Sequence, residues 1–305
     1  MTMNCSVCLS DQRRPFLEKN GYQIVRCHAC GFLYVHPRPG QDELEAFYQN
    51  PNYFQGDDDY GYAAYADERE VIERQATERL ALIERRAARG RLLDVGCAAG
   101  YFLRVAKERG WQVDGIEISP AAAQSAEQLL GQRLHLALEA FAATPESFDV
   151  VTLWEYIEHV LDPRDELRRV ARLLKPGGLL ALSTPNTGQF RAQRQPETWR
   201  EFKPPEHLSF FTVETLTVLL RACGFEPVLT RGVAPDICAP ERVQRWIDQL
   251  RQSLGDRHTR TTPFWWVYSL ARRVLRMPTN LYHRLFLSPF DYCQGIEVYA
   301  RKGSL

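Results

Sequence analysis

A short apolar run ends at Asp94, and a glycine turn from Gly96 to Gly100 follows it. Glycines let a ligand approach bare backbone at a helix N-terminus. A carboxylate beside such a turn attracts a positively charged group, by about 4 kcal/mol at about 4 Å near a protein surface. A second apolar run ends in Glu117, an acid at the offset where nucleotide-type folds hold a ribose. The two acids therefore predict a site for a ligand that carries a ribose and a cation.

The main alternative is a dinucleotide-binding turn, which needs glycine at its first, third and sixth positions. Gly96 fills the first position, but Ala98 and Tyr101 occupy the other two. A bulky sixth residue opposes close approach of a pyrophosphate. The run from Asp94 to Gly100 instead resembles motif I of the class I S-adenosylmethionine-dependent methyltransferases, with Ala98 in place of the middle glycine.

Later segments are similar to the same class and occur in its order. They are Phe148-Asp149-Val150-Val151, Glu158-His159, Asp162-Pro163, and Leu174-Lys175-Pro176-Gly177-Gly178. The resemblance covers about residues 91–232. It implies methyl transfer from S-adenosylmethionine, and an α/β fold with a Rossmann-like seven-stranded sheet and helices on both faces.

The resemblance also implies a role for each residue of the cofactor site. Asp94 would balance the ammonium and Glu117 would accept hydrogen bonds from both ribose hydroxyls. A helix cap would explain either acid alone, but the pair at this offset favours the cofactor. The remaining cofactor-binding residues are Gly96, Cys97, Gly100 and Tyr101 at the methionine end, Ile118 against the adenine, and Leu138 and Glu139 at the adenine edge.

Four cysteines near the N-terminus form two pairs, Cys5-x-x-Cys8 and Cys27-x-x-Cys30, separated by 18 residues. This is the spacing of a zinc ribbon, in which each pair turns two thiolates toward one tetrahedral ion. Four protein ligands close the coordination shell, which predicts a structural zinc. Four unrelated buried cysteines or a redox pair are the alternatives, and the doubled spacing without a βαβ unit disfavours both.

Acidic and imidazole groups follow the predicted fourth strand as Glu155-x-x-Glu158-His159, and His207 lies downstream. On a helix, positions i, i+3 and i+4 would share one face. The cluster resembles the ubiquinone-biosynthesis O-methyltransferases and the small-RNA 2′-O-methyltransferases, which implies a divalent ion, Mg or Zn, that orients the acceptor hydroxyl. Three mechanisms stay open: this metal, a general base at His159 or His207, and proximity alone.

Strands and helices alternate from Leu92 onward, which predicts a parallel sheet covered on both faces. The expected strands are 92–95, 112–117, 134–138, 148–153, 179–183, 225–232 and 296–301. The expected helices cover 67–89, the segment from the glycine turn to about 109, one that starts at Ser119-Pro120, 163–174 and 213–223.

Three parts are expected along the chain. Residues 1–40 form the zinc-ribbon-like module, 41–90 an aromatic lid and helical linker, and 91–305 the methyltransferase domain. The acidic, aromatic stretch 41–66 fits a lid over the cofactor or a solvated loop. The long insertion at about 235–293 fits a helical cap, with a membrane-surface helix as the alternative.

Charge and hydrophobicity limit the partners. The chain of 305 residues has 38 basic and 38 acidic residues, whereas phosphate contact brings a basic surplus; RNA methylation is therefore disfavoured, although the Arg-rich insertion argues for it. No run of 18 apolar residues and no signal peptide appear, so we expect a cytoplasmic protein without a transmembrane segment and with peripheral membrane contact disfavoured.

The expected reaction is O-methylation of a natural product, sugar or quinone-type ring; the alternative is N- or C-methylation of a nucleotide-linked sugar.

Overall fold

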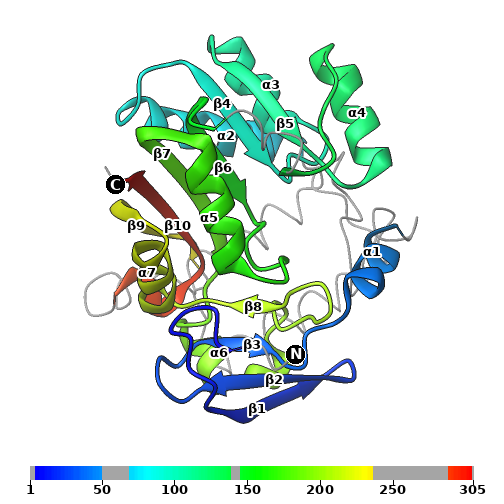
Figure 1. The fold of residues 1–305 in the computed structure, drawn as a ribbon, viewed down its shortest axis with the longest axis vertical. Helices are drawn as coiled ribbons and strands as arrows, with labels where there is room; N and C mark the ends of the chain where they lie inside the picture. The colour runs from blue at the N-terminus through cyan, green and yellow to red at the C-terminus, as the bar shows by residue number, and fades with distance from the viewer. Residues whose placement is uncertain (1–3, 50–68, 139–144, 236–287, 304–305) are drawn as a thin grey trace, which may run out of the picture.

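Two β-sheets form the framework of the molecule (Figure 1). The computed structural model describes residues 4–49, 69–138, 145–235 and 288–303. A six-stranded sheet has the order β5-β4-β6-β7-β10-β9, and a four-stranded sheet has the order β1-β2-β3-β8. The small sheet lies at one end of the molecule, beyond α5.

The large sheet confirms the predicted α/β class. Strands β5, β4, β6 and β7 run parallel, and β10 is antiparallel to both of its neighbours. Its strands are β4 (Arg91–Val95), β5 (Gln112–Ile116), β6 (Phe148–Trp154), β7 (Leu174–Pro185), β9 (Phe225–Pro235) and β10 (Cys293–Lys302). The expected strand at 134–138 contributes only a single parallel bridge, between His135 and Ile116. The backbone bends at residues 136–137, so the pairing does not continue. The described sheet therefore has six strands, with that bridge at the place of the seventh.

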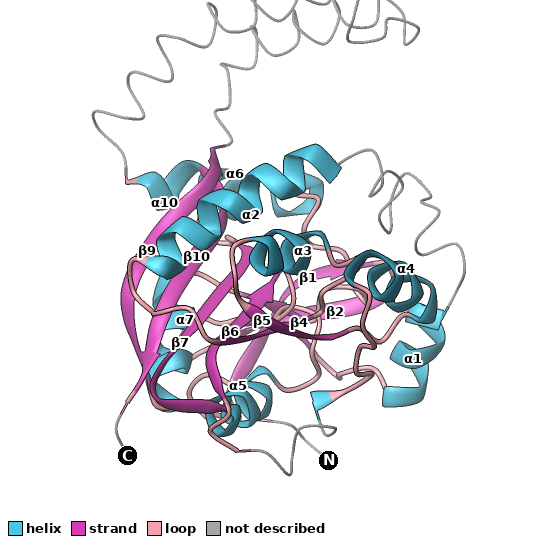
Figure 2. Ribbon diagram, turned by 90° about the horizontal axis from the view of Figure 1, so that it is seen from above, coloured by secondary structure: helices cyan, strands magenta, loops and turns pink. Residues whose placement is uncertain are grey.

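Helices cover both faces of this sheet (Figure 2). One face carries α2 (Arg69–Glu84), α3 (Tyr101–Glu108) and α4 (Pro120–Leu130), and the other carries α5 (Pro163–Leu173) and α7 (Val213–Ala222). Successive strand residues point to opposite faces, so Leu92 packs with α2 and α3 while Leu93 packs with α5 and α7. Both residues are fully buried.

Local signals place the helix starts where the sequence predicts them. Ser119 caps α4 and Asp162 caps α5, and each is followed by proline in the first turn. The segment 175–178, between the expected helix at 163–174 and the expected strand at 179–183, is a bulge within β7. Leu174 pairs with Phe148 and Leu179 with Val150, so the four intervening residues loop out without ending the strand.

The N-terminal module builds most of the small sheet. Its strands are β1 (Arg13–Lys19), β2 (Tyr22–Cys27) and β3 (Leu33–Val35), and β8 (Ser209–Phe210) from far along the chain adds the fourth. Leu33 pairs with Phe210 and Tyr34 with Ser209. The module therefore completes its sheet with residues that follow His207.

Short helices complete the described chain. These are α1 (Gln41–Gln49), α6 (Phe190–Arg194), the 3-10 helix η3 (Pro196–Thr198) and α10 (Pro289–Tyr292). Every helix in the described ranges is too short or too polar to cross a bilayer. Most of the expected lid, Glu139 and nearly all of the expected cap lie outside the described residues, so these stay predictions.

Candidate active site

A cavity of about 1010 Å³ opens at the carboxyl ends of the parallel strands, where ligands bind in open α/β sheets. Its volume is at the upper end of the range of small-molecule sites. Eight of the predicted site residues line it: Asp94, Gly96, Cys97, Glu117, Ile118, Leu138, Glu155 and His159. Gln41 and Leu44 of α1 also contribute to the wall.

Asp94 ends β4 and is 2% exposed. Burial raises the pKa of its carboxyl to about 7, although a hydrogen bond from Thr152 and the charge of Arg79 act in the opposite direction. The Thr152 hydroxyl donates to Oδ1 of Asp94 over 2.6 Å. The site thus holds a carboxyl whose charge a bound cation would stabilise.

Glu117 follows β5 and its two oxygens hold the glycine turn and the next helix together. Oε2 accepts the backbone N–H of Ala98 at 2.9 Å and Oε1 that of Ser119 at 2.8 Å. Ala98 has a φ of 46°, a left-handed conformation that costs an alanine about 1 kcal/mol or more. This explains why the resembled motif carries glycine at that position.

The glycines of the turn serve packing as well as ligand approach. A Cβ at residue 96 would lie 2.8 Å from Cδ2 of Tyr156, and one at residue 100 would lie 3.0 Å from Cβ of Ala126. Gly96 lines the cavity, whereas Gly100 and Tyr101 do not. Tyr101 instead lies beneath the guanidinium of Arg69, with Cζ 5.6 Å from the ring centre.

The segment from Glu155 to His159 is a turn rather than a helix. Glu155 has a φ of 48°, which breaks the helical spacing and separates it from the other ligand candidates. The structure brings together Glu158, His159 and His207, whose candidate ligand atoms lie within 4.8 Å of one another. Glu155 lies outside that group and lines the cavity.

The tautomers of both histidines follow from their hydrogen bonds. Nδ1 of His159 donates to the carbonyl of Glu206 and Nδ1 of His207 to that of Glu201, each over 2.9 Å. A neutral imidazole with a protonated Nδ1 has its lone pair on Nε2, and the carbonyl of Glu155 also lies near the ring of His159. Nε2 of His159 lies 3.9 Å from Oε1 of Glu158, so these groups offer the donor set of a divalent metal.

Burial sets the protonation of this cluster. It lowers the pKa of His159 to about 4 and that of His207 well below its usual value, and it raises that of Glu158 well above its usual value. Glu158 is 1% exposed, and neither of its buried carboxyl oxygens has a partner at normal hydrogen-bond distance in the described structure, although the hydroxyl of Thr184 lies near enough to lower the pKa of the carboxyl in part. A bound cation would satisfy these oxygens, so the residues fit a metal.

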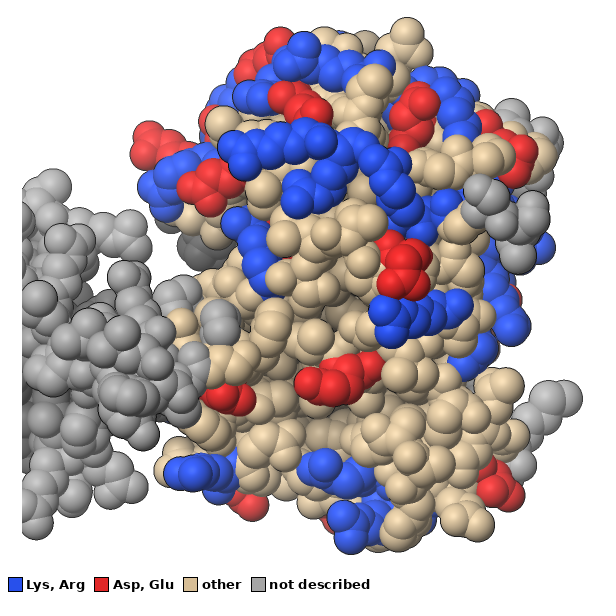
Figure 3. Space-filling view, turned by 90° about the vertical axis from the view of Figure 1, so that its left-hand side faces the viewer, with Lys and Arg blue, Asp and Glu red and all other residues tan. Residues whose placement is uncertain are grey.

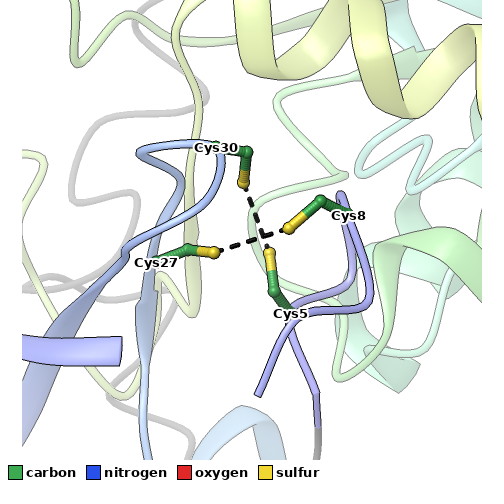
Figure 4. A group of neighbouring side chains, drawn as sticks. All are labelled: Cys5, Cys8, Cys27 and Cys30. Atoms are coloured by element: carbon green, nitrogen blue, oxygen red, sulfur yellow. Dashed lines mark hydrogen bonds between the residues drawn. The ribbon is translucent and has the colours of Figure 1, made fainter. Parts of the chain in front are cut away.

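The four N-terminal cysteines converge from two loops (Figure 4). Sγ of Cys5 lies 3.5 Å from Sγ of Cys30, and the sulfurs of Cys8 and Cys27 are separated by the same distance. The hydrogen bond from Cys30 lowers the pKa of Cys5 to about 5. Four sulfurs that converge on one point fit a tetrahedral metal ion.

Sequence reasoning missed a charged part of the cavity wall. Glu297 of β10 accepts hydrogen bonds from Arg79 at 2.9 Å and from Arg231 at 2.7 Å. It is 2% exposed, and all three residues line the cavity. A buried acid within an apolar strand was a visible signal, but its partners come from distant elements.

The comparisons with known proteins identify this arrangement. A family model described as a methyltransferase domain matches residues 65–230, more than half of the chain. The chain therefore belongs to the class I S-adenosylmethionine-dependent methyltransferases.

Curated relatives include ubiquinone biosynthesis O-methyltransferases. That of Ruegeria pomeroyi is 36% identical over 168 residues, covering 49% of this chain and 65% of the relative. That of Stutzerimonas stutzeri is 41% identical over 103 residues, covering 32% and 44%. The chain thus spans less than two thirds of the length of these relatives.

Solved structures share the fold at low identity. A methyltransferase from Archaeoglobus fulgidus matches with a TM-score of 0.52 and 18% identity, covering 77% of this chain and 94% of that one. Phosphoethanolamine N-methyltransferase 2 of Haemonchus contortus matches with a TM-score of 0.53 and 16% identity, covering 96% and 71%. Both matches support the fold alone.

Proposed function

We propose that the protein transfers a methyl group from S-adenosylmethionine to a hydroxyl oxygen of a small molecule, such as a natural product, a sugar or a quinone-type ring. The observation that carries the proposal is the cluster of Glu158, His159 and His207, in which His159 lines the same cavity as Asp94 and Glu117. The curated relatives named ubiquinone biosynthesis O-methyltransferases support a hydroxyl acceptor.

In the cofactor half of the cavity, we assign the ammonium to Asp94 and the ribose hydroxyls to Glu117. Ile118 is 57% exposed beside Glu117, and an adenine ring would cover it. Leu138 lines the same cavity and provides a second apolar contact. Gly96 and Cys97 line the cavity, and we assign the methionine part of the cofactor to the space beside them.

This assignment predicts a pH dependence of cofactor binding. Because the pKa of Asp94 is about 7 in the free protein, only a small fraction is ionised at pH 5.5, whereas the ammonium requires the carboxylate. The dissociation constant measured by calorimetric titration should therefore be about tenfold higher at pH 5.5 than at pH 7.0. Asp94→Asn should bind more weakly and lose most of this difference. An unchanged pH dependence in that variant would remove Asp94 from the assignment.

In the acceptor half, we propose a divalent ion held by Glu158, His159 and His207, with Glu155 facing the acceptor. A histidine with a pKa of about 4 is a weak base for a hydroxyl proton at neutral pH, which disfavours the general-base alternative. Such a residue stays unprotonated and suits metal ligation. When bound, the divalent ion would lower the pKa of the acceptor hydroxyl and fix its oxygen.

Methyl transfer then requires that the acceptor oxygen be aligned with the methyl group of the sulfonium. The bond between the sulfonium sulfur and the methyl carbon breaks as the acceptor oxygen bonds to that carbon; the sulfur leaves as a neutral thioether and the hydroxyl proton passes to solvent water. Asp94 and Glu117 hold the ammonium and the ribose of the donor, which fixes the sulfonium between them.

A structural zinc at Cys5, Cys8, Cys27 and Cys30 completes the proposal. The seven described cysteines are free thiols, which supports the cytoplasmic location expected for a metal-binding cysteine set.

Basic and acidic side chains are interspersed on the face drawn in Figure 3, and the 38 basic and 38 acidic residues balance. These charges favour a small acceptor over RNA.

The proposal is tested by methyl transfer from labelled S-adenosylmethionine to three matched acceptors: catechol, phenol and aniline. The chelated full-length protein is reloaded with zinc alone or with zinc and magnesium. We expect the catechol ether to form chiefly in the presence of magnesium. Methylation of aniline in preference to both hydroxyl acceptors would contradict O-transfer. A rate that magnesium does not change and that Glu158→Gln does not lower would contradict the divalent ion.

A further inference from the structure

The four-cysteine module is joined by backbone hydrogen bonds to the segments that carry the acceptor-side cluster. The N–H of Val35 in β3 donates to the carbonyl of Leu208 over 3.0 Å. On its other side, the N–H groups of Leu208 and Ser209 donate to the carbonyl of Glu158, at 2.8 and 3.1 Å. The residue after His207 is therefore tied to the module and to Glu158 at the same time.

The module also supports the loop that leads to His207. Lys19 donates to the carbonyl of Trp199 and Asn20 to that of Pro204, over 3.3 and 3.0 Å. Arg38 donates to Oγ of Ser209 over 2.9 Å. A shared apolar core lies beneath these contacts and includes Ile24, Leu33, Val35, Trp199, Phe202 and Leu208.

A separate connection reaches the segment that carries His159. Arg164 in the first turn of α5 is 8% exposed, and its guanidinium donates to the carbonyls of Ser6 and Val7 over 2.6 and 2.5 Å. Both carbonyls lie between Cys5 and Cys8. The guanidinium thus holds the first cysteine loop against the helix that begins shortly after His159.

We propose that the four-cysteine module is a positioning element of the acceptor site, and that Arg164 and the pairing of β3 with β8 transmit its order to Glu158 and His207. The segments at 155–160 and 199–208 have little regular hydrogen bonding of their own, so tertiary contacts set their geometry. A module this small depends on its metal for stability. Metal loss at the cysteines therefore loosens the cluster, while the cofactor turn keeps its support from β4 and β5.

Hydrogen exchange of the full-length protein tests the connection without any assumption about activity. In Arg164→Gln we expect the amides of residues 205–211 and 155–161 to exchange about tenfold faster, with residues 92–105 unchanged. Arg168→Gln, an exposed position on the same helix, is the matched control and should exchange like wild type. Ser209→Ala, which removes only the acceptor for Arg38, should act in the same direction with a smaller effect.

The same exchange measurement on zinc-loaded and zinc-depleted protein tests the role of the metal. Faster exchange at residues 155–161 and 205–211 on depletion, with residues 92–105 unchanged, is the expected result. Equal exchange with and without zinc, or an Arg164→Gln profile identical to that of Arg168→Gln, would overturn the proposal.

A binding measurement connects the proposal to function, and this part rests on the proposed divalent site. With zinc-loaded protein and Mn²⁺ as the probe, Arg164→Gln should weaken Mn²⁺ binding about tenfold and leave the affinity for S-adenosylmethionine unchanged. Arg164→Lys, which keeps a donor for one carbonyl, should recover part of the loss. Wild-type protein that binds no Mn²⁺ would contradict the divalent site, and the exchange data would still decide the positioning role. If Arg164→Gln binds Mn²⁺ as tightly as wild type does, the positioning role of the module is contradicted, whereas the divalent site is not.

Discussion

Replacing Glu158 with glutamine should lower the rate of methyl transfer by about 100-fold or more at saturating S-adenosylmethionine. Loss of an outer partner of a metal site typically costs 10- to 100-fold, so loss of a carboxylate ligand should cost at least as much. Glutamine keeps the shape of the side chain and removes its charge. Single-turnover rates, with cofactor affinity measured separately, report the effect; we expect the affinity to change less than about threefold.

Two further measurements separate this effect from a fold defect. Neither buried carboxyl oxygen of Glu158 has a partner at normal hydrogen-bond distance in the described structure, so glutamine should not lower the melting temperature of metal-free protein. The matched control is Glu214→Gln at an exposed position in the first turn of α7, which should turn over like wild type. If Glu158→Gln also turns over normally, acceptor chemistry does not need this carboxylate.

Replacing Glu117 with alanine should raise the dissociation constant of S-adenosylmethionine by about 100-fold. Two hydrogen bonds to a carboxylate contribute about 3 kcal/mol at the lower end of their range, and each 1.4 kcal/mol corresponds to tenfold in affinity. Alanine also removes the acceptor for the N–H groups of Ala98 and Ser119, which adds to the loss. Calorimetric titration at fixed pH measures it.

Glu117→Gln and Asp114→Ala are the companion variants. Glutamine keeps one carbonyl oxygen at the same place, so we expect a loss of about tenfold. Asp114 lies on the same strand and pairs with Arg91 over 3.0 Å, outside the residues that line the cavity; its replacement should leave the affinity within about threefold. An affinity unchanged in Glu117→Ala would show that the ribose binds elsewhere.

The large sheet was predictable because its signals are local. Apolar runs bounded by turns mark β4 to β6, and Ser119-Pro120 and Asp162-Pro163 mark two helix starts by cap and first-turn chemistry. The convergence of the four cysteines likewise follows from their spacing. The single bridge at His135 was not predictable, because strand length at a sheet edge depends on tertiary contacts.

The site was predictable in its residue types but less so in its geometry. The tautomers of His159 and His207 depend on carbonyls of Glu206 and Glu201, which no periodicity reveals. The left-handed backbone of Glu155 breaks the expected helical face. Arg79, Arg231 and Glu297 meet from α2, β9 and β10, so their contact requires the tertiary fold.

The pairing of β3 with β8 also bears on the order in which the protein is made. The cysteine module is synthesised before Ser209 and Phe210, so the outer edge of β3 has no partner until those residues follow. Sheet contacts between segments so far apart in sequence form slowly, and an unpaired edge attracts other strands in the meantime. Early metal capture would close the cysteine loops before this edge has a partner. Zinc supply during synthesis should therefore govern the yield of native protein, and chains stopped before Phe210 should aggregate.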